Sequence, residues 1–426
     1  MSRRQERNEG HPVERLLVLG DVSFAYPTSA PAERPLVVLP LEGGVGPAAV
    51  DVLRATDPLG GPRARVRTDD RTFDVVVDPT FPGWTGTALH PAARTALAGA
   101  GHSLTADALD RLTPLVLLRT HPSGSTTDVL ACSRLRAGGA LFTRIATIAS
   151  GAEEHAVVDR ALDELHRPLP HVLSDTFQCT GLSKDVEIET KLSLSGTRSS
   201  WALASRISTL VGTADLPGFV PDLGNEVQRW QSSQRTWEVL VPEAEAGYLA
   251  LMDFGTGTFA VKRKRFQADA LRREETFRYD IDLPAEDLDG YMQSLYPDLK
   301  LRRLPSHRRS KFDVNVQSVS SGHFFGIEID EVHVLDSPHA MSQLEIEYHR
   351  SVVHDGLDAA TIEPELLRLT THVRALLATW GEDAQETTYS KLSFLRDLVD
   401  HDASPFGWRT DVVTPSHEIG VEVGVR

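Results

Sequence analysis

Hydrophobic and polar positions alternate every second residue through long parts of this chain, which is the period of a β-strand. The runs contain many β-branched and aromatic residues, and glycine and proline separate them. The alternation predicts strands at residues 15–19, 35–39, 73–77, 115–118, 185–192, 235–241, 259–266, 276–281, 309–316, 325–332 and 342–348.

A helical period of apolar positions marks fewer segments. Residues 153–166 show it most clearly in the first half of the chain. Residues 128–133 and 140–149 fit either a pair of strands or a pair of helices. The pattern also predicts helices at residues 48–55, within 90–112 with Ser103 or Thr105 as a cap, and at 201–211, 284–296, 362–380 and 389–400.

A proline-containing break at residues 169–171 divides the chain into two parts. We expect residues 1–10 to be a disordered tail and residues 11–172 to form an accessory domain of the α/β or α+β class, whose role the sequence does not indicate. Strand patterns dominate the second part and helices interrupt them. The fold class expected for the whole chain is therefore α+β.

The charged residues of the stretch 185–192 form an ordered set. On a strand, Glu187, Glu189 and Lys191 share one face, and apolar residues occupy the other. Two carboxylates followed by an ammonium group suit a hard divalent cation held beside a phosphate chain. The paired carboxylates recur at Glu345 and Glu347. The alternative is an ordinary amphipathic strand whose charges are solvated.

Lysine is rare and unevenly placed. The chain has seven lysines against 37 arginines, and every lysine lies at or beyond position 184. Lys262 and Lys264 share one face of a strand, where compact ammonium groups would lie side by side. Chance clustering is the alternative. If the strands fold antiparallel and close on themselves, their inner faces form a lumen, and a water- and ligand-filled tunnel avoids the cost of burying unpaired charges.

Composition narrows the class of partner. The chain has 426 residues, 41% of them hydrophobic, which is enough for two or three domains with sizeable cores. The net charge of −16 argues against nucleic acid. Cys132 and Cys179 make neither a disulfide framework nor a metal cluster. Without a signal-type or membrane-spanning apolar run, we expect a cytoplasmic protein with no membrane partner; a homodimer is compatible with the sequence.

Residues 183–400 resemble the CYTH, or triphosphate tunnel metalloenzyme, superfamily, which leaves residues 401–426 as a C-terminal extension. Its E-x-E-x-K signature resembles Glu187 to Lys191, and the strand at 259–266 is similar to the family's lysine-rich strand. Further similarities are Arg273-Glu274-Glu275, the strand 327–331, Glu345-Ile346-Glu347, and Ser390-Lys391 in the last helix. The resemblance implies an antiparallel β-tunnel, usually of eight strands, that is closed or nearly closed.

The resemblance also implies a role for each matching residue. Mg²⁺ or Mn²⁺ would be bound by carboxylates at Glu187, Glu189, Asp330, Glu345 and Glu347. Phosphate groups would be bound by Lys191, Lys262, Lys264, Arg273, Arg309 and Lys311. The catalytic residues would be Lys191, Lys264 and Glu275. Glu275 and Asp330 would hold basic side chains in place or complete a second metal site.

The chain departs from the family between Lys191 and Lys262, where a clear Arg-x-Arg strand is lacking. Three tryptophans lie there, Trp201, Trp230 and Trp237, either as core or as the lining of a pocket for an organic group.

The function expected is divalent-metal-dependent hydrolysis of a triphosphate: inorganic triphosphate, a nucleoside triphosphate or thiamine triphosphate. Three alternatives remain open: a tunnel enzyme acting on a phosphorylated or diphosphate-bearing metabolite, an adenylate cyclase of the class found in this superfamily, and a non-catalytic module that binds polyphosphate or nucleotide.

Overall fold

The structure is a computed structural model. It describes residues 15–21, 35–43, 48–54, 57–68, 71–77, 91–99, 105–136, 139–151, 153–166, 179–183, 186–195, 199–222, 226–254, 259–266, 272–279, 281 and 287–401. The expected tail at 1–10, the candidate cap Ser103 and residues 402–426 of the extension lie outside these ranges.

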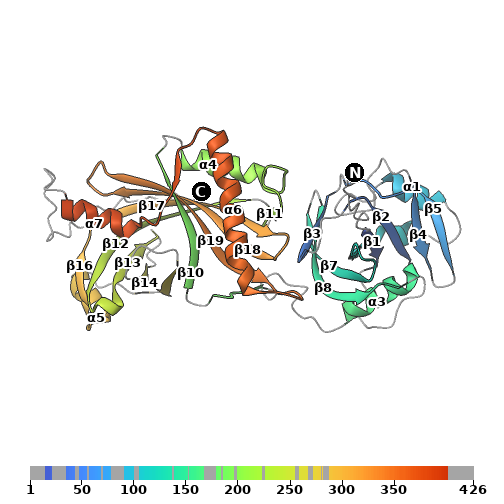
Figure 1. Cartoon of the computed structure of the whole chain (residues 1–426), viewed down its shortest axis with the longest axis horizontal. Helices are drawn as coiled ribbons and strands as arrows, with labels where there is room; N and C mark the ends of the chain where they lie inside the picture. The colour runs from blue at the N-terminus through green and yellow to red at the C-terminus, as the bar shows by residue number, and fades with distance from the viewer. Residues whose placement is uncertain are drawn as a thin grey trace, which may run out of the picture.

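The chain forms two antiparallel sheets with few helices, which agrees with the α+β class (Figure 1). The first sheet has eight strands in the order β3-β8-β7-β6-β1-β2-β4-β5. Their bounds are β1 Arg15–Gly20, β2 Leu36–Leu41, β3 Val50–Arg54, β4 Arg63–Arg67, β5 Thr72–Val76, β6 Thr113–Thr120, β7 Thr126–Arg136 and β8 Gly139–Ala149.

Three helices accompany this sheet: α1 (Pro91–Gly99), α2 (Ala106–Asp110) and α3 (Glu154–His166). Thr105 caps α2, because its Oγ1 accepts a hydrogen bond from the backbone N–H of Ala108 at 3.1 Å. Helix α3 packs with one face of the sheet in a core that includes Val18 and Val116. The region around residues 126–149, which the sequence left open, is a strand pair.

The helix predicted at residues 48–55 is wrong. Residues Val50–Arg54 form the edge strand β3, which pairs along β8 from Val50 opposite Thr143 to Arg54 opposite Gly139. Val50 and Leu53 are buried in this arrangement. A helix this short is marginally stable by itself, so helical propensity does not decide the conformation of the segment. Pairing with β8 gives its backbone N–H and C=O groups hydrogen-bond partners in a strand.

The second sheet has twelve strands. Its main path runs β11-β17-β18-β19-β10-β15-β14-β13-β12-β16, while β9 and β20 pair at its margins. The strands are β9 Cys179–Thr180, β10 Val186–Leu194, β11 Phe219–Pro221, β12 Val227–Val241, β13 Gly247–Asp253, β14 Phe259–Arg265, β15 Arg272–Arg278, β16 Lys300–Arg303, β17 His307–Ser318, β18 His323–Val334, β19 Ala340–Val352 and β20 Ala384–Glu386.

Eight of these strands form a ring. The long strand β12 pairs with β13 through residues 233–239 and with β17 through residues 227–234, so the path from β17 through β18, β19, β10, β15, β14 and β13 returns to its start. Since side chains on a strand alternate between faces, each ring strand has one inner and one outer face. The sequence pattern predicted seven of these eight strands and missed β13, and most of the seven are longer than the alternating run that marked them.

Apolar outer faces of the ring are covered by helices. Helices α4 (Ser200–Leu210) and α6 (Ile362–Thr379) pack against β10, β17, β18 and β19, and α5 (Leu288–Leu295) packs against β12, β13 and β14 (Figure 1). Two single turns complete the helical segments, η2 (Glu243–Glu245) and η3 (Ala359–Thr361). Among the described residues, no helix combines the length and apolar character needed to cross a membrane.

Helix α7 (Lys391–His401) is placed differently, because it packs on the inner face. Its Leu392 and Leu395 contact Tyr248 on β13 and Val334 on β18. Lys264 and His307 point to the inside of the ring near one of its ends. Tyr248 lies directly opposite Lys264, and Val334 lies directly opposite His307, so Tyr248 and Val334 also belong to the inner face at that end. Helix α7 therefore covers that end.

The two sheets meet through a small apolar core. Val50 and Leu141 of the first sheet pack with Val220, Phe324 and Val352 of the second. The backbone N–H of Val50 donates to the carbonyl of Val319 at 3.1 Å, which ties edge strand β3 to the loop after β17.

Candidate functional site

The inner face of the ring collects the acidic and basic residues that the sequence singled out. Strands β10 and β19 pair so that Glu189 lies directly opposite Glu347, and Lys191 lies directly opposite Glu345. Directly opposed residues share a face of the sheet. The two E-x-E segments, 158 residues apart in the sequence, are therefore neighbours on one surface.

Lys264, on β14, reaches over the intervening strand β15 to the first of these glutamates. Its Nζ lies 2.6 Å from Glu187 Oε1 and 2.9 Å from Glu275 Oε2. Lys262 lies 2.8 Å from the same oxygen of Glu275. Burial alone would raise the pKa of Glu187, but the charges of Lys264, Lys262 and Lys191 outweigh it and lower that pKa to about 2. Glu275 holds the two ammonium groups beside each other.

Glu189 lies at the centre of the cluster and is 1% exposed. Lys191 Nζ is 2.7 Å from its Oε2, and an Arg273 nitrogen is 3.3 Å from its Oε1. Burial and the charge of Glu187 nevertheless raise the pKa of Glu189. The two cations therefore do not fully offset the negative charge gathered around this carboxylate.

A second group lies toward the end that α7 covers. Arg309 makes two hydrogen bonds to Asp330, at 2.8 and 2.7 Å. Lys391, from the start of α7, lies 2.7 Å from Asp330 and 2.9 Å from Glu345. Burial opposes ionisation of Glu345, but Lys191, Lys391 and Arg309 hold its pKa well below the usual range. Asp330 and Glu345 are thus already neutralised by side chains.

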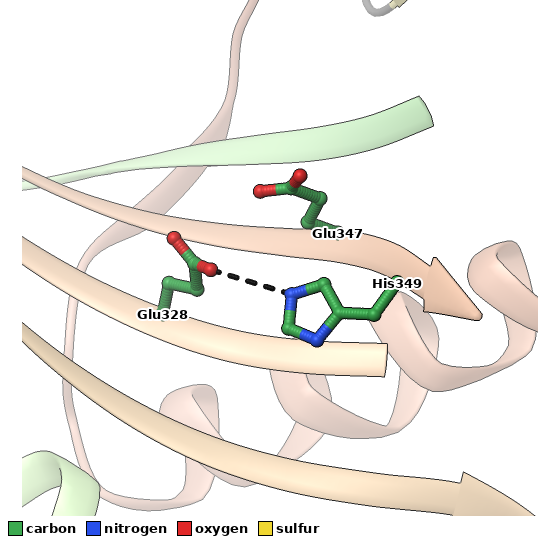
Figure 2. Close-up of side chains that lie close together, drawn as sticks. All are labelled: Glu328, Glu347 and His349. Carbon is green, nitrogen blue, oxygen red and sulfur yellow. Dashed lines mark ion pairs between the residues drawn. The ribbon is translucent and has the colours of Figure 1, made fainter. Parts of the chain in front are cut away.

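Sequence reasoning missed three residues of this surface: Asp313, Glu328 and His349. Lys311 pairs with two of them, at 3.1 Å from Asp313 and 2.8 Å from Glu328. His349 lies two residues after Glu347 on β19, and its Nε2 is 3.5 Å from Glu328 Oε1 (Figure 2). The signal for them was present in the alternation, since Asp313 is two residues after Lys311 and Glu328 is two residues before Asp330.

Three carboxylates crowd together without enough cations. Ligand oxygens of Glu187, Glu189 and Glu347 all lie within 4.8 Å of one another. Burial, and then the charges of Glu187, Glu328 and Glu189, raise the pKa of Glu347 well above the usual range. Among the described residues Glu347 has no ion-pair partner. Such a cluster favours either protonation or a bound cation.

The ring is aromatic at the end away from α7, where we define the rim as Trp230, Phe277 and Tyr279. Phe277 lies opposite Lys262, and Trp230 lies opposite Lys311, so both are on the inner face. All three side chains are exposed, from 42% for Phe277 to 62% for Tyr279. The rings of Phe277 and Tyr279 stack with centroids 5.6 Å apart, and Lys262 Nζ lies 5.0 Å from the Phe277 centroid.

The three tryptophans have three environments. Trp237 is 2% exposed in the outer core, where its indole N–H donates to Asp289 at 2.7 Å. Trp201 is exposed on α4 and packs against Phe312, with ring centroids 5.6 Å apart. Trp230 alone of the three belongs to the inner face.

A cavity of about 480 Å³ lies elsewhere, between the two sheets. Its lining includes Arg54, Phe219 and Arg368. Arg54 donates to the carbonyl of Gly212, and Arg368 pairs with Glu365, so both cations are engaged within the protein. The cavity shares none of its lining residues with the charged inner face, which is the surface with reactive chemistry.

No family model and no curated protein matches the chain. A solved structure, the di-domain ARO/CYC StfQ from the steffimycin biosynthetic pathway, aligns at 10% identity over 78% of this chain and 84% of its own, with a TM-score of 0.14. That similarity is too weak to carry an argument on fold or function.

Proposed function

We propose that the ring is a triphosphate tunnel and that the protein is a divalent-metal-dependent phosphohydrolase acting on a triphosphate. The observation that carries the proposal is the convergence of Glu187, Glu189 and Glu347 beside the ammonium groups of Lys191 and Lys264 on one buried surface. The same residues carry the resemblance to the CYTH superfamily.

The carboxylate oxygens of Glu187, Glu189 and Glu347 are chemically suited to bind a divalent cation. Glu347 is unpaired among the described residues and has a raised pKa, and Glu189 has a raised pKa despite two cationic neighbours. Hard carboxylate oxygens gathered within 4.8 Å are ligands that Mg²⁺ and Mn²⁺ accept. Asp330 and Glu345 would instead position Arg309 and Lys391, since those ion pairs already neutralise them.

Phosphate oxygens would be bound by the cations that now pair with carboxylates around the inner face. These are Lys191, Lys262, Lys264, Arg273, Arg309 and Lys311. In this proposal Glu275 is a positioning residue, because it holds Lys262 and Lys264 side by side. A bound divalent cation would polarise the terminal phosphoryl group.

The protein would supply orientation and charge to an attacking water. The water oxygen forms the new bond to the terminal phosphorus, the bridging P–O bond breaks, and the shortened phosphate chain leaves. The proton of the water passes to solvent. Positive charge on the lysines would stabilise the charge that develops on the leaving oxygen.

The rim favours a substrate that carries a planar ring. Stacking on exposed aromatic side chains is a common way to hold a heterocycle without base-specific hydrogen bonds. Phe277 and Tyr279 offer such a surface next to Lys262. Among the triphosphates considered, nucleoside and thiamine triphosphates have a ring to stack, whereas inorganic triphosphate does not.

Release of inorganic phosphate tests the proposal. The full chain with Mn²⁺ should hydrolyse a triphosphate, and Glu189→Gln and Lys262→Met should each lower kcat/KM on the order of 100-fold or more. Lys300→Met, which removes an exposed lysine from β16, is the matched control and should retain the rate. Absence of phosphate release from every triphosphate, with Mg²⁺ and with Mn²⁺, would remove the proposal.

The alternatives are separated by their products. A cyclase would convert ATP into cyclic AMP and pyrophosphate, and a binding module would be stabilised by a triphosphate without consuming it. An enzyme for a phosphorylated metabolite would turn that metabolite over and leave ATP intact.

A further inference from the structure

Glu328, Glu347 and His349 form a mixed carboxylate–imidazole cluster beside the carboxylate trio. Potential ligand atoms of the three residues all lie within 4.8 Å of one another. Figure 2 shows them converging from two neighbouring strands, with Glu328 on β18 and the other two on β19. Glu347 belongs to both clusters, whereas Glu328 and His349 have no part in the function proposed above.

A glycine makes room for the imidazole. Gly326 lies directly opposite Glu347 on β18, and a Cβ at position 326 would lie 2.6 Å from Cε1 and 2.8 Å from Nε2 of His349. The ring therefore lies over bare backbone. Gly326 is not among the glycines with positive φ, so its backbone conformation does not require glycine. The absence of a side chain at Gly326 instead leaves room for the His349 imidazole.

An unsatisfied oxygen lies on the adjoining strand. Asp313, on β17, is directly opposite Glu328 and is 4% exposed. Its Oδ1 is buried and has no hydrogen-bond partner within the described part of the chain. An unsatisfied buried carboxylate oxygen costs free energy, and so does the unpaired carboxylate of Glu347. Both costs fall when positive charge enters the space between these strands.

Lys311 does not exclude a cation from this space. Its Nζ lies 2.8 Å from Glu328 Oε1, which is the oxygen nearest to His349. The same Nζ lies 3.1 Å from Asp313 Oδ2. Lys311 can therefore stay on Asp313 when Glu328 binds a metal ion, and the lysine keeps an ion pair in either state.

We propose that Glu328, Glu347 and His349 bind a second divalent cation, which shares Glu347 with the ion at Glu187 and Glu189. An imidazole nitrogen suits Mn²⁺, Co²⁺ or Zn²⁺ and is seldom a ligand of Mg²⁺. The site selects a transition metal, whereas the all-carboxylate trio accepts Mg²⁺ as well. The proposal extends the proposed function to a second ion, but it is tested by binding and needs no turnover.

The test is the stoichiometry of Mn²⁺ bound to the full chain, measured from the EPR signal of free Mn²⁺, together with pulsed EPR of the bound ion. We expect two Mn²⁺ per chain and a nitrogen modulation from one imidazole. His349→Gln should lower the stoichiometry to one and abolish the nitrogen modulation. Glu189→Gln should weaken the other ion and leave the nitrogen modulation in place.

His333→Gln is the matched control. His333 also lies beside a glutamate on a strand, with its Nε2 3.6 Å from Glu331, but it is exposed. This variant should keep two ions and the nitrogen modulation. The proposal is overturned if the wild-type chain shows no nitrogen modulation, or if the modulation survives in His349→Gln. A wild-type chain that shows the modulation but releases no phosphate would reject the hydrolase and keep the site.

Discussion

At the scale of single residues, the inner face is a set of charges whose protonation states depend on one another. Lys264 neutralises Glu187 and Glu275, while Glu347 is left among like charges. The ion pairs of Lys264 stabilise the fold, and the unpaired charge of Glu347 destabilises it. Substitutions at the two kinds of position should therefore have opposite effects on the free energy of unfolding.

Lys264→Met leaves the carboxylates of Glu187 and Glu275 without their shared partner. Removing one member of a buried ion pair typically costs about 3–5 kcal/mol. We expect a loss of this size in the free energy of unfolding, measured by urea titration at pH 7. Lys300→Met, at an exposed lysine, should change it by less than about 0.5 kcal/mol. Equal effects of the two substitutions would contradict the ion-pair assignment.

Glu347→Gln removes a charge that the fold disfavours. A carboxyl whose pKa is raised in the folded state costs stability as the pH rises from its unfolded pKa through its folded pKa, so Glu347 destabilises the fold at pH 8. In EDTA the variant should melt a few degrees higher than the wild type. It should also lose most of the increase in Tm that Mn²⁺ gives the wild type.

The control for that experiment is Glu243→Gln, which alters an exposed glutamate of η2. Its Tm should match the wild type with and without Mn²⁺. A lower Tm for Glu347→Gln in EDTA would show that the carboxylate is paired in the native protein.

His323 gives the fold a dependence on pH that is separate from the site. It is fully buried and hydrogen-bonded to Ser351 and Thr361, and burial lowers its pKa to about 4. Between pH 6.5 and 4 the unfolded chain binds more protons at this residue, so stability falls as pH falls through that range.

The expected size is about 3 kcal/mol once pH 4 is reached. Urea midpoints measured from pH 7 to pH 4.5 in the wild type and in His323→Gln provide the check. The variant should be less stable at pH 7 but show a shallower decline. A decline of the same slope in both proteins would mean that His323 does not contribute to it.

At the scale of elements, alternation predicted most of the strands and the face each charge would occupy. It did so because side chains alternate between the two faces of any strand, so residues two apart share a face whichever strands pair with it. The edge strand at Val50–Arg54 was mistaken for a helix, since its fate depends on β8, which lies about 90 residues later. Glu328 and His349 were overlooked because their importance depends on Gly326 and Glu347, which only the cross-strand register brings beside them.

Helix α7 closes one end of the ring with apolar contacts and with ion pairs made by Lys391, Arg396 and Asp400. Leu392 and Leu395 are each 1% exposed, and Lys391 contacts Asp330 and Glu345. Leu395→Ala should loosen α7 locally, because the other elements of the ring are held by their own pairings. Hydrogen exchange of amides 391–401 should accelerate while that of β18 and β19 is unchanged. Acceleration across the whole ring would show that α7 is needed for closure.

At the scale of the whole molecule, the ring has one end covered by α7 and an aromatic rim at the other. In the proposed function the phosphate chain lies among the inner charges and the organic group lies at the rim. The net charge argued against a nucleic-acid partner, but composition could not show which end of the ring carries the charges and which carries the aromatic residues. The register between neighbouring strands decides at which end of the ring each charge lies. The sequence of a single strand does not specify that register.

Phe277→Ala removes the stacking surface and leaves the charged inner face intact. We expect KM for a nucleoside or thiamine triphosphate to rise on the order of 10-fold, as loss of one base-stacking contact costs about 1–3 kcal/mol. KM for inorganic triphosphate should not change. Leu367→Ala, at an exposed leucine of the outer helix α6, is the control and should alter neither. A rise for inorganic triphosphate as well would place Phe277 in the phosphate site.

The most direct measurement of the central claim is ³¹P NMR of the full chain incubated with Mg²⁺ and a mixture of inorganic triphosphate, ATP and thiamine triphosphate. A triphosphate–cation site on the inner face predicts growth of the inorganic phosphate resonance together with the matching diphosphate, and neither signal in Glu189→Gln. Spectra that stay unchanged, or that show a cyclic phosphodiester without growth of the inorganic phosphate resonance, would contradict it.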